Sequence, residues 1–300
     1  MIAVDWGTSS LRAYRLAANG KVAEQRRADL GILACGGNFA AALAAQIEGW
    51  NDSDIVLSGM IGSRNGWVEM PYLDCPAGIP ELAAGMKRID TPEFAGRALW
   101  FVPGLANGSD TETPDVMRGE ETQLCGLLDT MSQGTHMICL PGTHSKWVTV
   151  RDGRVASFTT AMTGEVYAVL RQHSILGKLM NGDASRFDAY AFDAGLRRSA
   201  QSGGLLHHLF GVRTAGLFQR FTESALPSYL SGLLIGHEVH ASELLTRAPR
   251  PAQVHLIGSD RLLSAYAHAL LALGIGVQRH SEQLAALGMY RVARARGLTG

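Results

Sequence analysis

Residues 2–14 read IAVDWGTSSLRAY, two apolar, strand-like segments joined by a turn of glycine and hydroxyl residues. A second turn of this kind lies in MICLPGTHSKWVTV, residues 137–150, and again separates apolar segments. Such turns offer backbone N–H groups and hydroxyls around a small cavity, which is what a polyphosphate needs. Two of them in one chain therefore indicate two half-sites that close on one nucleotide.

The composition indicates a globular protein with a sizeable core. The chain has 300 residues, 46% hydrophobic and 18% charged, enough for one large domain or two ordinary ones. Its 27 basic and 27 acidic residues balance, which argues against a surface for nucleic acid or anionic membrane. We find neither a membrane-spanning apolar segment nor an N-terminal signal pattern. The four cysteines lack zinc-site spacing and fit a reducing compartment, so we expect a cytoplasmic protein.

Helices and strands alternate along the chain, which is the pattern of an α/β fold. Helical spacing of apolar residues runs from Asp115 to Met131, directly before the second turn. The strand and turn order of residues 1–28 then recurs at 137–160, a weak repeat of architecture rather than of sequence. Later, LIGSD at residues 256–260 ends a strand that leads into a helix.

Two domains that each open with a phosphate-binding hairpin resemble the actin-like ATPase superfamily, which includes sugar kinases and actin. Within it, the chain is most similar to the 2-dehydro-3-deoxygalactonokinase family. This resemblance spans the whole chain and rests on VDWGTSSLR at 4–12, GMIGSR at 59–64, MRGEETQ at 117–123 and LPGTHSKWV at 140–148.

The resemblance implies a fold of two RNase H-like domains, each a mixed five-stranded sheet with flanking helices, and a nucleotide cleft between them. We assign residues 1–114 to the first domain, with the C-terminal helix as a candidate addition. Residues 115–300 form the second domain in this assignment.

The resemblance also implies an enzyme. We expect a kinase that uses ATP and Mg2+ to phosphorylate the C6 hydroxyl of 2-dehydro-3-deoxy-D-galactonate in D-galactonate catabolism. Two alternatives stay open: a kinase of the same fold acting on another sugar or sugar acid, and a non-catalytic ATP-binding sensor. A dinucleotide-binding oxidoreductase is disfavoured because no G-x-G-x-x-G motif follows a strand. The expected partner is a small sugar acid, with no nucleic acid or membrane, and a homodimer is one option for assembly.

The two hairpins and the later glycine turn supply the candidate nucleotide ligands. Asp5 ends the first strand and offers an oxygen to hydrated Mg2+, although aspartate is also a common turn cap. Phosphate contacts are expected from Gly7, Thr8, Ser9 and Ser10 in the first hairpin and from Gly142, Thr143, His144, Ser145 and Lys146 in the second. Lys146 can neutralise phosphate charge or point to solvent. Gly258 and Ser259 resemble the turn against which adenosine packs.

A carboxylate is needed to accept the proton of the attacking sugar hydroxyl. In hexokinase-like relatives this group opens the helix before the second hairpin. Glu121 aligns best with that position, and Glu120, one residue earlier, is the alternative. Acidic residues are also common in a first helical turn because of the helix dipole, so either glutamate can have that ordinary role.

A sugar acid requires a cation for its carboxylate, and arginine offers a planar fork for it. Arg64 is the first candidate, because it lies in a glycine-rich loop that follows a buried strand. Arg12 and Arg118 are the alternatives. Three further residues of the loop, Ser63, Asn65 and Trp67, are candidates to contact hydroxyls or to stack on the sugar.

Overall fold

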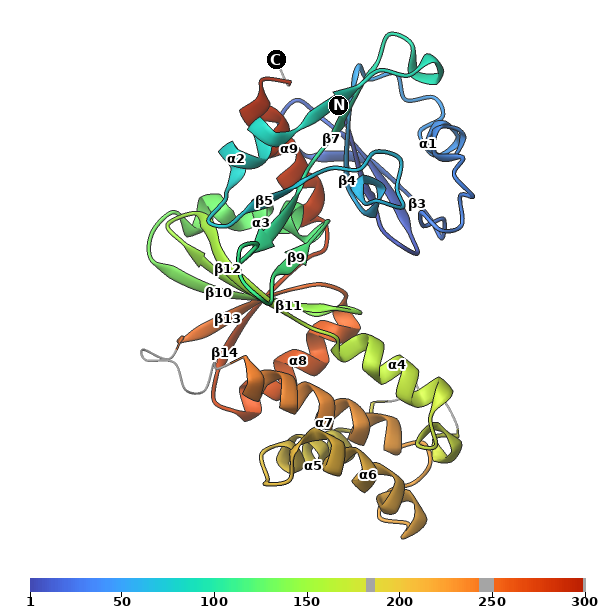
Figure 1. Cartoon of the computed structure of the whole chain (residues 1–300), viewed down its shortest axis with the longest axis vertical. Coiled ribbons are helices and arrows are strands. Elements are labelled where there is room, and N and C mark those ends of the chain that lie inside the picture. The colour runs from blue at the N-terminus through green and yellow to red at the C-terminus, as the bar shows by residue number, and fades with distance from the viewer. Residues whose placement is uncertain (182–186, 243–250, 299–300) are drawn as a thin grey trace. The chain divides into compact units, whose positions relative to one another are not determined.

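The computed structural model describes residues 1–181, 187–242 and 251–298, and Figure 1 traces the chain. By its contacts the chain forms two compact units. The first comprises Met1–His136, Val148–Phe158 and Ser281–Gly300, and the second Met137–Trp147 and Thr159–His280. Both contain helices and strands, in agreement with the predicted α/β class. This division cuts through three strands, and the domain boundary expected after residue 114 stays a prediction.

The first sheet has six strands in the order β3-β2-β1-β4-β7-β6. They are β1 Ile2–Trp6, β2 Leu11–Leu16, β3 Val22–Ala28, β4 Asp54–Gly59, β6 Lys87–Ile89 and β7 Ala98–Phe101. β1 pairs antiparallel with β2 and parallel with β4, so the sheet is mixed, as predicted. The predicted number of five strands is wrong here, because β6 adds an antiparallel edge strand beside β7. A strand of three residues is too short for its alternation to be recognised in the sequence.

Trp6 anchors the first hairpin in the core of this unit. Its ring packs edge-on against Phe39 of helix α1 (Phe39–Gln46), with ring centroids 5.8 Å apart. Its indole Nε1 donates a hydrogen bond to the Leu30 carbonyl at 2.9 Å, so the buried donor is satisfied. The residue directly before the glycine turn is therefore fixed on both its apolar and its polar sides.

A smaller sheet leads into helix α3 (Glu120–Leu128). It has the order β5-β8-β9, with β5 Tyr72–Asp74, β8 Gly104–Asn107 and β9 Asp115–Met117. The helix predicted from Asp115 to Met131 is therefore wrong at its start, because β9 pairs antiparallel with β8. Gly119, with φ of 110°, then turns the chain into the helix, a conformation that favours glycine.

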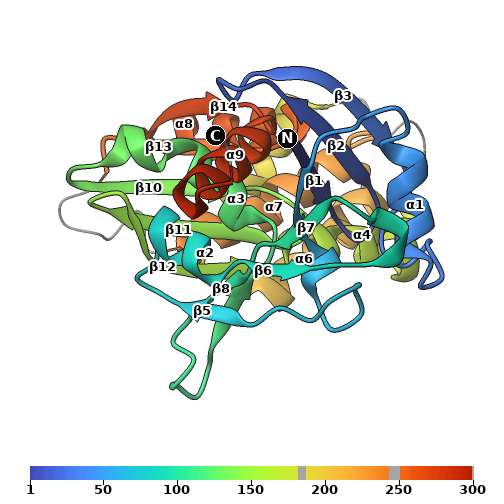
Figure 2. The ribbon, with the colours of Figure 1, turned by 90° about the horizontal axis from the view of Figure 1, so that it is seen from above.

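Helix α3 packs closely against α9 (Leu284–Arg296), so the last helix of the chain belongs to the first unit. Figure 2 shows the two helices side by side. A Cβ on Gly288 would lie 1.7 Å from the Thr122 carbonyl oxygen, and one on Gly126 would lie 2.6 Å from that of Leu284. The remaining short elements are α2 Ile79–Gly85, η1 Met60–Gly62, η2 Pro92–Phe94 and η3 Asp129–Met131.

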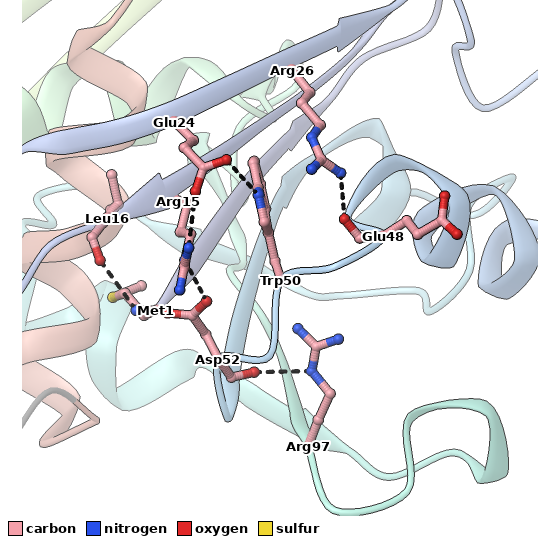
Figure 3. Close-up of polar contacts among 9 residues, drawn as sticks. All are labelled: Met1, Arg15, Leu16, Glu24, Arg26, Glu48, Trp50, Asp52 and Arg97. Atoms are coloured by element: carbon pink, nitrogen blue, oxygen red, sulfur yellow. Dashed lines mark hydrogen bonds and ion pairs between the residues drawn. The ribbon is translucent and has the colours of Figure 1, made fainter.

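A polar cluster fixes the end of the sheet at which β1 begins (Figure 3). The amino group of Met1 donates to Asp52 Oδ1 at 2.9 Å, and Arg15 Nε donates to Asp52 Oδ2 at 3.1 Å. Arg15 Nη1 also donates to Glu24 at 2.9 Å, and Glu24 accepts from Trp50 Nε1 at 3.1 Å. These contacts join β1, β2 and β3 to the segment that precedes β4.

The second sheet has five strands, as predicted, in the order β12-β11-β10-β13-β14. They are β10 Thr135–Leu140, β11 Ser145–Arg151, β12 Arg154–Ala161, β13 Gln253–Ile257 and β14 Gly276–His280. β13 pairs parallel with both β10 and β14. Sequence-adjacent β10, β11 and β12 lie next to one another, which confirms the second strand meander.

Helix α7 is the centre of the helical layer of the second unit. The helices here are α4 Thr163–His173, η4 Gly177–Leu179, α5 Ala189–Ser199, α6 Gly204–Leu217, α7 Leu226–Ala241 and α8 Asp260–Ala272. α7 contacts α4, α5, α6 and α8, which explains why it is apolar on nearly every side. In the part of the chain that the structure describes, no helix combines the length and apolar character needed to cross a membrane.

We expect Gly288→Ala to lower the free energy of unfolding by about 3 kcal/mol, because the added methyl group overpacks the contact between α3 and α9. Gly211→Ala on α6 is the matched control, since nothing lies within 4 Å of a Cβ built there. The control should be neutral or raise stability by about 0.5–1 kcal/mol. Urea denaturation measures both changes, and a Gly288→Ala protein as stable as the wild type would contradict the close contact.

Candidate functional site

In the first unit, the carboxyl ends of two parallel strands bring functional groups together. Asp5 on β1 pairs in register with Ser58 on β4. Ser58 Oγ in turn donates to Glu121 Oε1 of α3 at 3.1 Å. A Cβ on Gly119 would lie 3.3 Å from the Cα of Gly59, so two glycines let the start of the helix approach this sheet edge. Asp5 and Glu121 are thereby linked through Ser58.

The two glutamates at the start of α3 have different surroundings. Glu121 is 1% exposed, and its Oε2 accepts a 2.6 Å hydrogen bond from the Gly119 N–H. Burial raises the pKa of Glu121 to about 8, and the nearby charge of Glu120 acts in the same direction. Glu120 is only half-buried, and its Oε2 accepts from the Arg118 N–H at 3.2 Å. Glu121 is thus closed to solvent, whereas Glu120 remains accessible.

Asp5 lies in a strongly charged environment. Burial raises the pKa of Asp5 to about 6; Arg12 opposes this shift, while Glu120 and Glu282 reinforce it. Arg12 Nη1 lies 3.4 Å from Asp5 Oδ2, and Arg12 Nη2 lies 2.9 Å from Glu282 Oε2. The guanidinium of Arg12 is therefore engaged by two carboxylates of this chain.

The first hairpin forms as predicted at the end of β1. The Gly7 N–H donates to the Ser10 carbonyl at 2.9 Å, which closes the turn. Thr8 and Ser9 at its tip are exposed, and Ser10 is half-buried. The hairpin therefore presents two hydroxyls to solvent, directly after the strand that contains Asp5.

The four residues predicted to contact the sugar lie in one loop but differ in exposure. Arg64 and Asn65 are exposed, and Ser63 is half-buried. Trp67 packs in the aromatic core, with its ring stacked on Phe39 at a centroid distance of 6.4 Å. It also meets the rings of Phe94 and Phe101, so the structure places Trp67 among core side chains rather than beside the other three.

In the second hairpin, the residues at the tip are the accessible ones. Thr143 and His144 are exposed, and Gly142 is half-buried. The Glu165 N–H of α4 donates to the Thr143 carbonyl at 3.0 Å, and the Glu165 carboxylate pairs with His144 Nε2 at 2.5 Å. A Cβ on Gly164 would lie 2.3 Å from the Gly142 carbonyl oxygen. The start of α4 therefore supports the hairpin directly.

Ser145 and Lys146 are placed differently from the tip residues. Both are buried, at 0% and 5% exposure. Ser145 Oγ hydrogen-bonds the hydroxyl of Tyr266 at 2.8 Å, and Lys146 Nζ donates to Thr160 Oγ1 at 2.7 Å. Lys146 does not point to solvent, which was one of the two options for it.

Glu238 on α7 organises the polar interior behind this hairpin and was not anticipated. Trp147 Nε1 donates to its Oε1 at 2.8 Å, and the Tyr266 hydroxyl donates to its Oε2 at 2.6 Å. Burial raises the pKa of Glu238, although hydrogen bonds from Thr163, Tyr266, Trp147 and Ser145 act to lower it. The sequence signal for this network is a single acidic residue in a mostly apolar helix.

A cavity of about 630 Å³ lies within the second unit, next to the second hairpin. Its wall contains Gly142, Thr163, Gly164, Tyr167, Arg171, Phe187, Pro227, Ser228, Ser231, Leu234, Ile235, Arg261, Leu262, Ser264, Ala265, Tyr266 and His268. A mostly apolar wall with a few polar groups is typical of a small-molecule pocket.

Gly258 and Ser259 lie beside the second hairpin, as a consequence of strand pairing. Cys139 on β10 and Leu256 on β13 are register partners in a parallel pair, so the strands end at the same sheet edge. A Cβ on Gly258 would lie 3.3 Å from the Pro141 carbonyl oxygen. Ser259 is exposed and precedes α8, whose residues line the cavity.

The described residues contain no group of three or more His, Cys, Asp or Glu side chains arranged to hold a metal ion. Asp5 is near enough to Glu120 and Glu282 for their charges to raise its pKa. The carboxylate of Asp5 could hold Mg2+, which keeps several waters and takes one or two carboxylates besides phosphate oxygens.

Comparisons with known proteins agree with the resemblance. A model of the family described as 2-keto-3-deoxy-galactonokinase matches residues 5–292. The chain is 32% identical to the 2-dehydro-3-deoxygalactonokinase of Escherichia coli, over 92% of this chain and 91% of that protein. It is also similar to a protein of Sinorhizobium meliloti with the same family name, whose crystal structure has a TM-score of 0.87, 35% identity and 98% coverage of both chains.

The fold extends beyond close relatives. An activator of the 2-hydroxyisocaproyl-CoA dehydratase from Clostridium difficile has a TM-score of 0.53 at 12% identity, covering 99% of this chain and 96% of that one. Identity this low shows the fold alone. With the two mixed sheets, this similarity confirms the predicted actin-like class of fold.

We expect the stability of Glu121→Gln, relative to the wild type, to rise with pH. The folded-state pKa of about 8 exceeds the unfolded value, so the stability from this proton is present at low pH and is lost as pH rises through 8. Glutamine mimics the protonated acid. The variant should match the wild type near pH 5 and be more stable by roughly 2–4 kcal/mol near pH 9. Urea denaturation at both pH values measures this, and a constant difference would contradict the raised pKa.

We expect Glu238→Leu to lower the unfolding free energy by about 3–5 kcal/mol, because it leaves the buried donors of Trp147 and Tyr266 without an acceptor. The exposed Glu223→Ala is the control and should stay within about 0.5 kcal/mol of the wild type. Thermal melts followed by circular dichroism compare the variants, and equal losses in both would show that the network contributes nothing.

Proposed function

Because the chain belongs to the 2-keto-3-deoxy-galactonokinase family, we propose that it transfers the terminal phosphoryl group of ATP to the C6 hydroxyl of 2-dehydro-3-deoxy-D-galactonate. The products are ADP and the 6-phosphorylated sugar acid, in the breakdown of D-galactonate. The observation that carries this proposal is the family match over residues 5–292, which includes both hairpins and the start of α3.

We propose that the hairpins bind phosphate through their accessible tips, since phosphoryl transfer depends mainly on positioning and charge stabilisation. The exposed Thr8 and Ser9 support this role in the first hairpin, and the exposed Thr143 and His144 support it in the second. The buried Ser145 and Lys146 then hold the second hairpin rather than touch the nucleotide. The cavity lined by residues of α8, the helix that follows Gly258 and Ser259, is the proposed adenosine pocket.

Mg2+ is the proposed metal, held through water by Asp5. The bound cation would neutralise phosphate charge during transfer. Binding a cation here would suit the carboxylates around Asp5, whose pKa is raised by burial and by Glu120 and Glu282. A divalent cation would relieve that repulsion.

Glu120 is the proposed base, in place of the first-ranked Glu121. A base must lie within reach of the hydroxyl that it deprotonates, and Glu120 is the accessible member of the pair. Both carboxylate oxygens of Glu121 accept hydrogen bonds from this chain, and its pKa of about 8 leaves it protonated at neutral pH. Glu121 then orients the start of α3 through Ser58 and Gly119.

A cytoplasmic location is part of the proposal. All four cysteines are free, which fits a reducing compartment, and two of them, Cys125 and Cys139, are buried. Assembly as a homodimer stays a prediction.

ADP release by the purified protein with ATP and Mg2+ tests the function. We expect turnover with 2-dehydro-3-deoxy-D-galactonate and little with its gluconate epimer or with N-acetylglucosamine. Glu120→Gln should lower kcat by about 100- to 10,000-fold through loss of the base. Glu121→Gln should retain most activity at pH 7, because it replaces a carboxyl that is already protonated.

Two outcomes would contradict these assignments. Absence of turnover on all three sugars, with ATP still bound, would contradict the proposed substrate. A loss of kcat in Glu121→Gln as large as that in Glu120→Gln, with both proteins folded, would return the role of base to Glu121.

A further inference from the structure

Arg118 is a buried cation whose donors are only partly used. It lies one residue before Gly119 and is 9% exposed. Its Nη2 donates to the Met70 carbonyl at 2.7 Å, and its guanidinium carbon lies 4.2 Å from the centroid of the Tyr72 ring. Within the described residues, Nε and Nη1 are buried and have no hydrogen-bond partner.

Burying the unpaired donors of Arg118 costs free energy unless a ligand pairs with them. Buried polar groups in folded proteins are nearly always paired, and a buried charge without an anion loses its hydration without compensation. The Tyr72 ring offsets part of this cost through a cation–π contact. No acidic side chain of the described chain forms an ion pair with Arg118, so the guanidinium is suited to an anionic group from outside the protein.

A second unpaired group lies in the loop whose residue Met70 contacts Arg118. The hydroxyl of Ser63 is also buried without a partner among the described residues. Ser63 directly follows Gly62, and a Cβ on Gly62 would lie 3.2 Å from Arg118 Nη1. Gly62 therefore adjoins Ser63 in the chain and approaches Arg118 Nη1, and Met70 Cγ lies 3.3 Å from the same Cβ position.

We propose that Arg118 and Ser63 bind the carboxylate of the sugar acid and so determine the specificity of the kinase for acidic substrates. This inference rests on the proposed function and names the part of the site that recognises the acid. Nη1 of Arg118 donates to one carboxylate oxygen, and the Ser63 hydroxyl donates to the other. Both donor atoms are closed to solvent in this structure, so the carboxylate reaches them only after a local rearrangement.

The other two arginine candidates fit this role less well. Arg12 already pairs with Asp5 and Glu282, so an added carboxylate would compete with two others. Arg64 is exposed, and an exposed ion pair adds little because water screens it. A buried donor contributes more to discrimination, because an analogue without the matching charge leaves it unpaired.

Arg118 also lies directly before α3, the helix that carries the proposed base. Its own backbone N–H donates to Glu120 Oε2 at 3.2 Å, so the carboxylate site and the proposed base are joined by one short segment. Binding the acid at Arg118 would position the far hydroxyl of the same substrate while the base stays in place. In this proposal, the groups for the carboxylate and for the reacting hydroxyl both lie next to the start of α3 in the chain.

The test compares the sugar acid with its neutral C1 amide as substrates. The wild type should prefer the acid through a lower KM. Arg118→Met should raise KM for the acid by roughly 10- to 100-fold, as expected for loss of a charged hydrogen bond, and leave KM for the amide nearly unchanged. Arg118→Lys should fall between the two, and Ser63→Ala should shift the same ratio in the same direction. Arg88→Met, on the exposed edge strand β6, is the control and should leave the ratio unchanged.

The outcomes separate this inference from the proposed function. An unchanged acid-to-amide ratio in Arg118→Met and Arg118→Lys, in an active and folded protein, would overturn the inference and leave the function standing. A ratio that collapses in Arg64→Met instead would assign the carboxylate to Arg64. If the wild type turns over neither compound, the proposed function fails. Calorimetry of acid binding without ATP, to wild-type and Arg118→Met protein, then decides the inference by itself: equal affinities overturn it.

Discussion

The parallel pairing of β1 with β4 is the constraint on which the first half of the site depends. It sets Asp5 beside Ser58, and Ser58 then reaches Glu121 by a 3.1 Å hydrogen bond. Through this contact the first turn of α3 is fixed against the sheet edge. The position of Glu120 and the local charge around Asp5 both follow from it. A side chain at Gly119 would press on Gly59 and separate the start of the helix from the strands, and one at Gly59 would clash with the Trp6 carbonyl of β1.

The second unit also fixes its hairpin at a sheet edge through a buried glutamate, but with different residues. Its hairpin also lies at the end of a parallel pair, β10 with β13, and a buried glutamate again stands behind it. Glu238 accepts hydrogen bonds from Trp147 and Tyr266, and these side chains come from a strand and a helix that meet at the hairpin. In both units a glutamate that is closed to solvent orients the groups that remain accessible. Such fully paired buried carboxylates provide rigidity because each unpaired donor would be costly.

The difference in burial explains why neighbouring acidic residues have different roles in the proposed site. Glu120 and Glu121 are adjacent, yet burial raises the pKa of Glu121 to about 8 while Glu120 stays at the accessible surface. The same reasoning applies to Arg64 and Arg118, one exposed and one enclosed. Residue type alone does not assign a role, since the cost of removing a charge from water depends on its surroundings.

The sequence by itself determined the α/β class, the two hairpins and the acidic start of α3, because these features are local. Glycine and hydroxyl turns, strand alternation and an acid in a first helical turn depend on neighbours within a few residues. It did not reveal β6 or β9, whose three residues each become strands only through pairing with β7 and β8. Nor did it show that Ser145 and Lys146 are buried, or that Glu238 and Arg118 are enclosed. Tertiary structure decided those properties, because burial, ion pairing and unpaired donors arise from segments far apart in the chain.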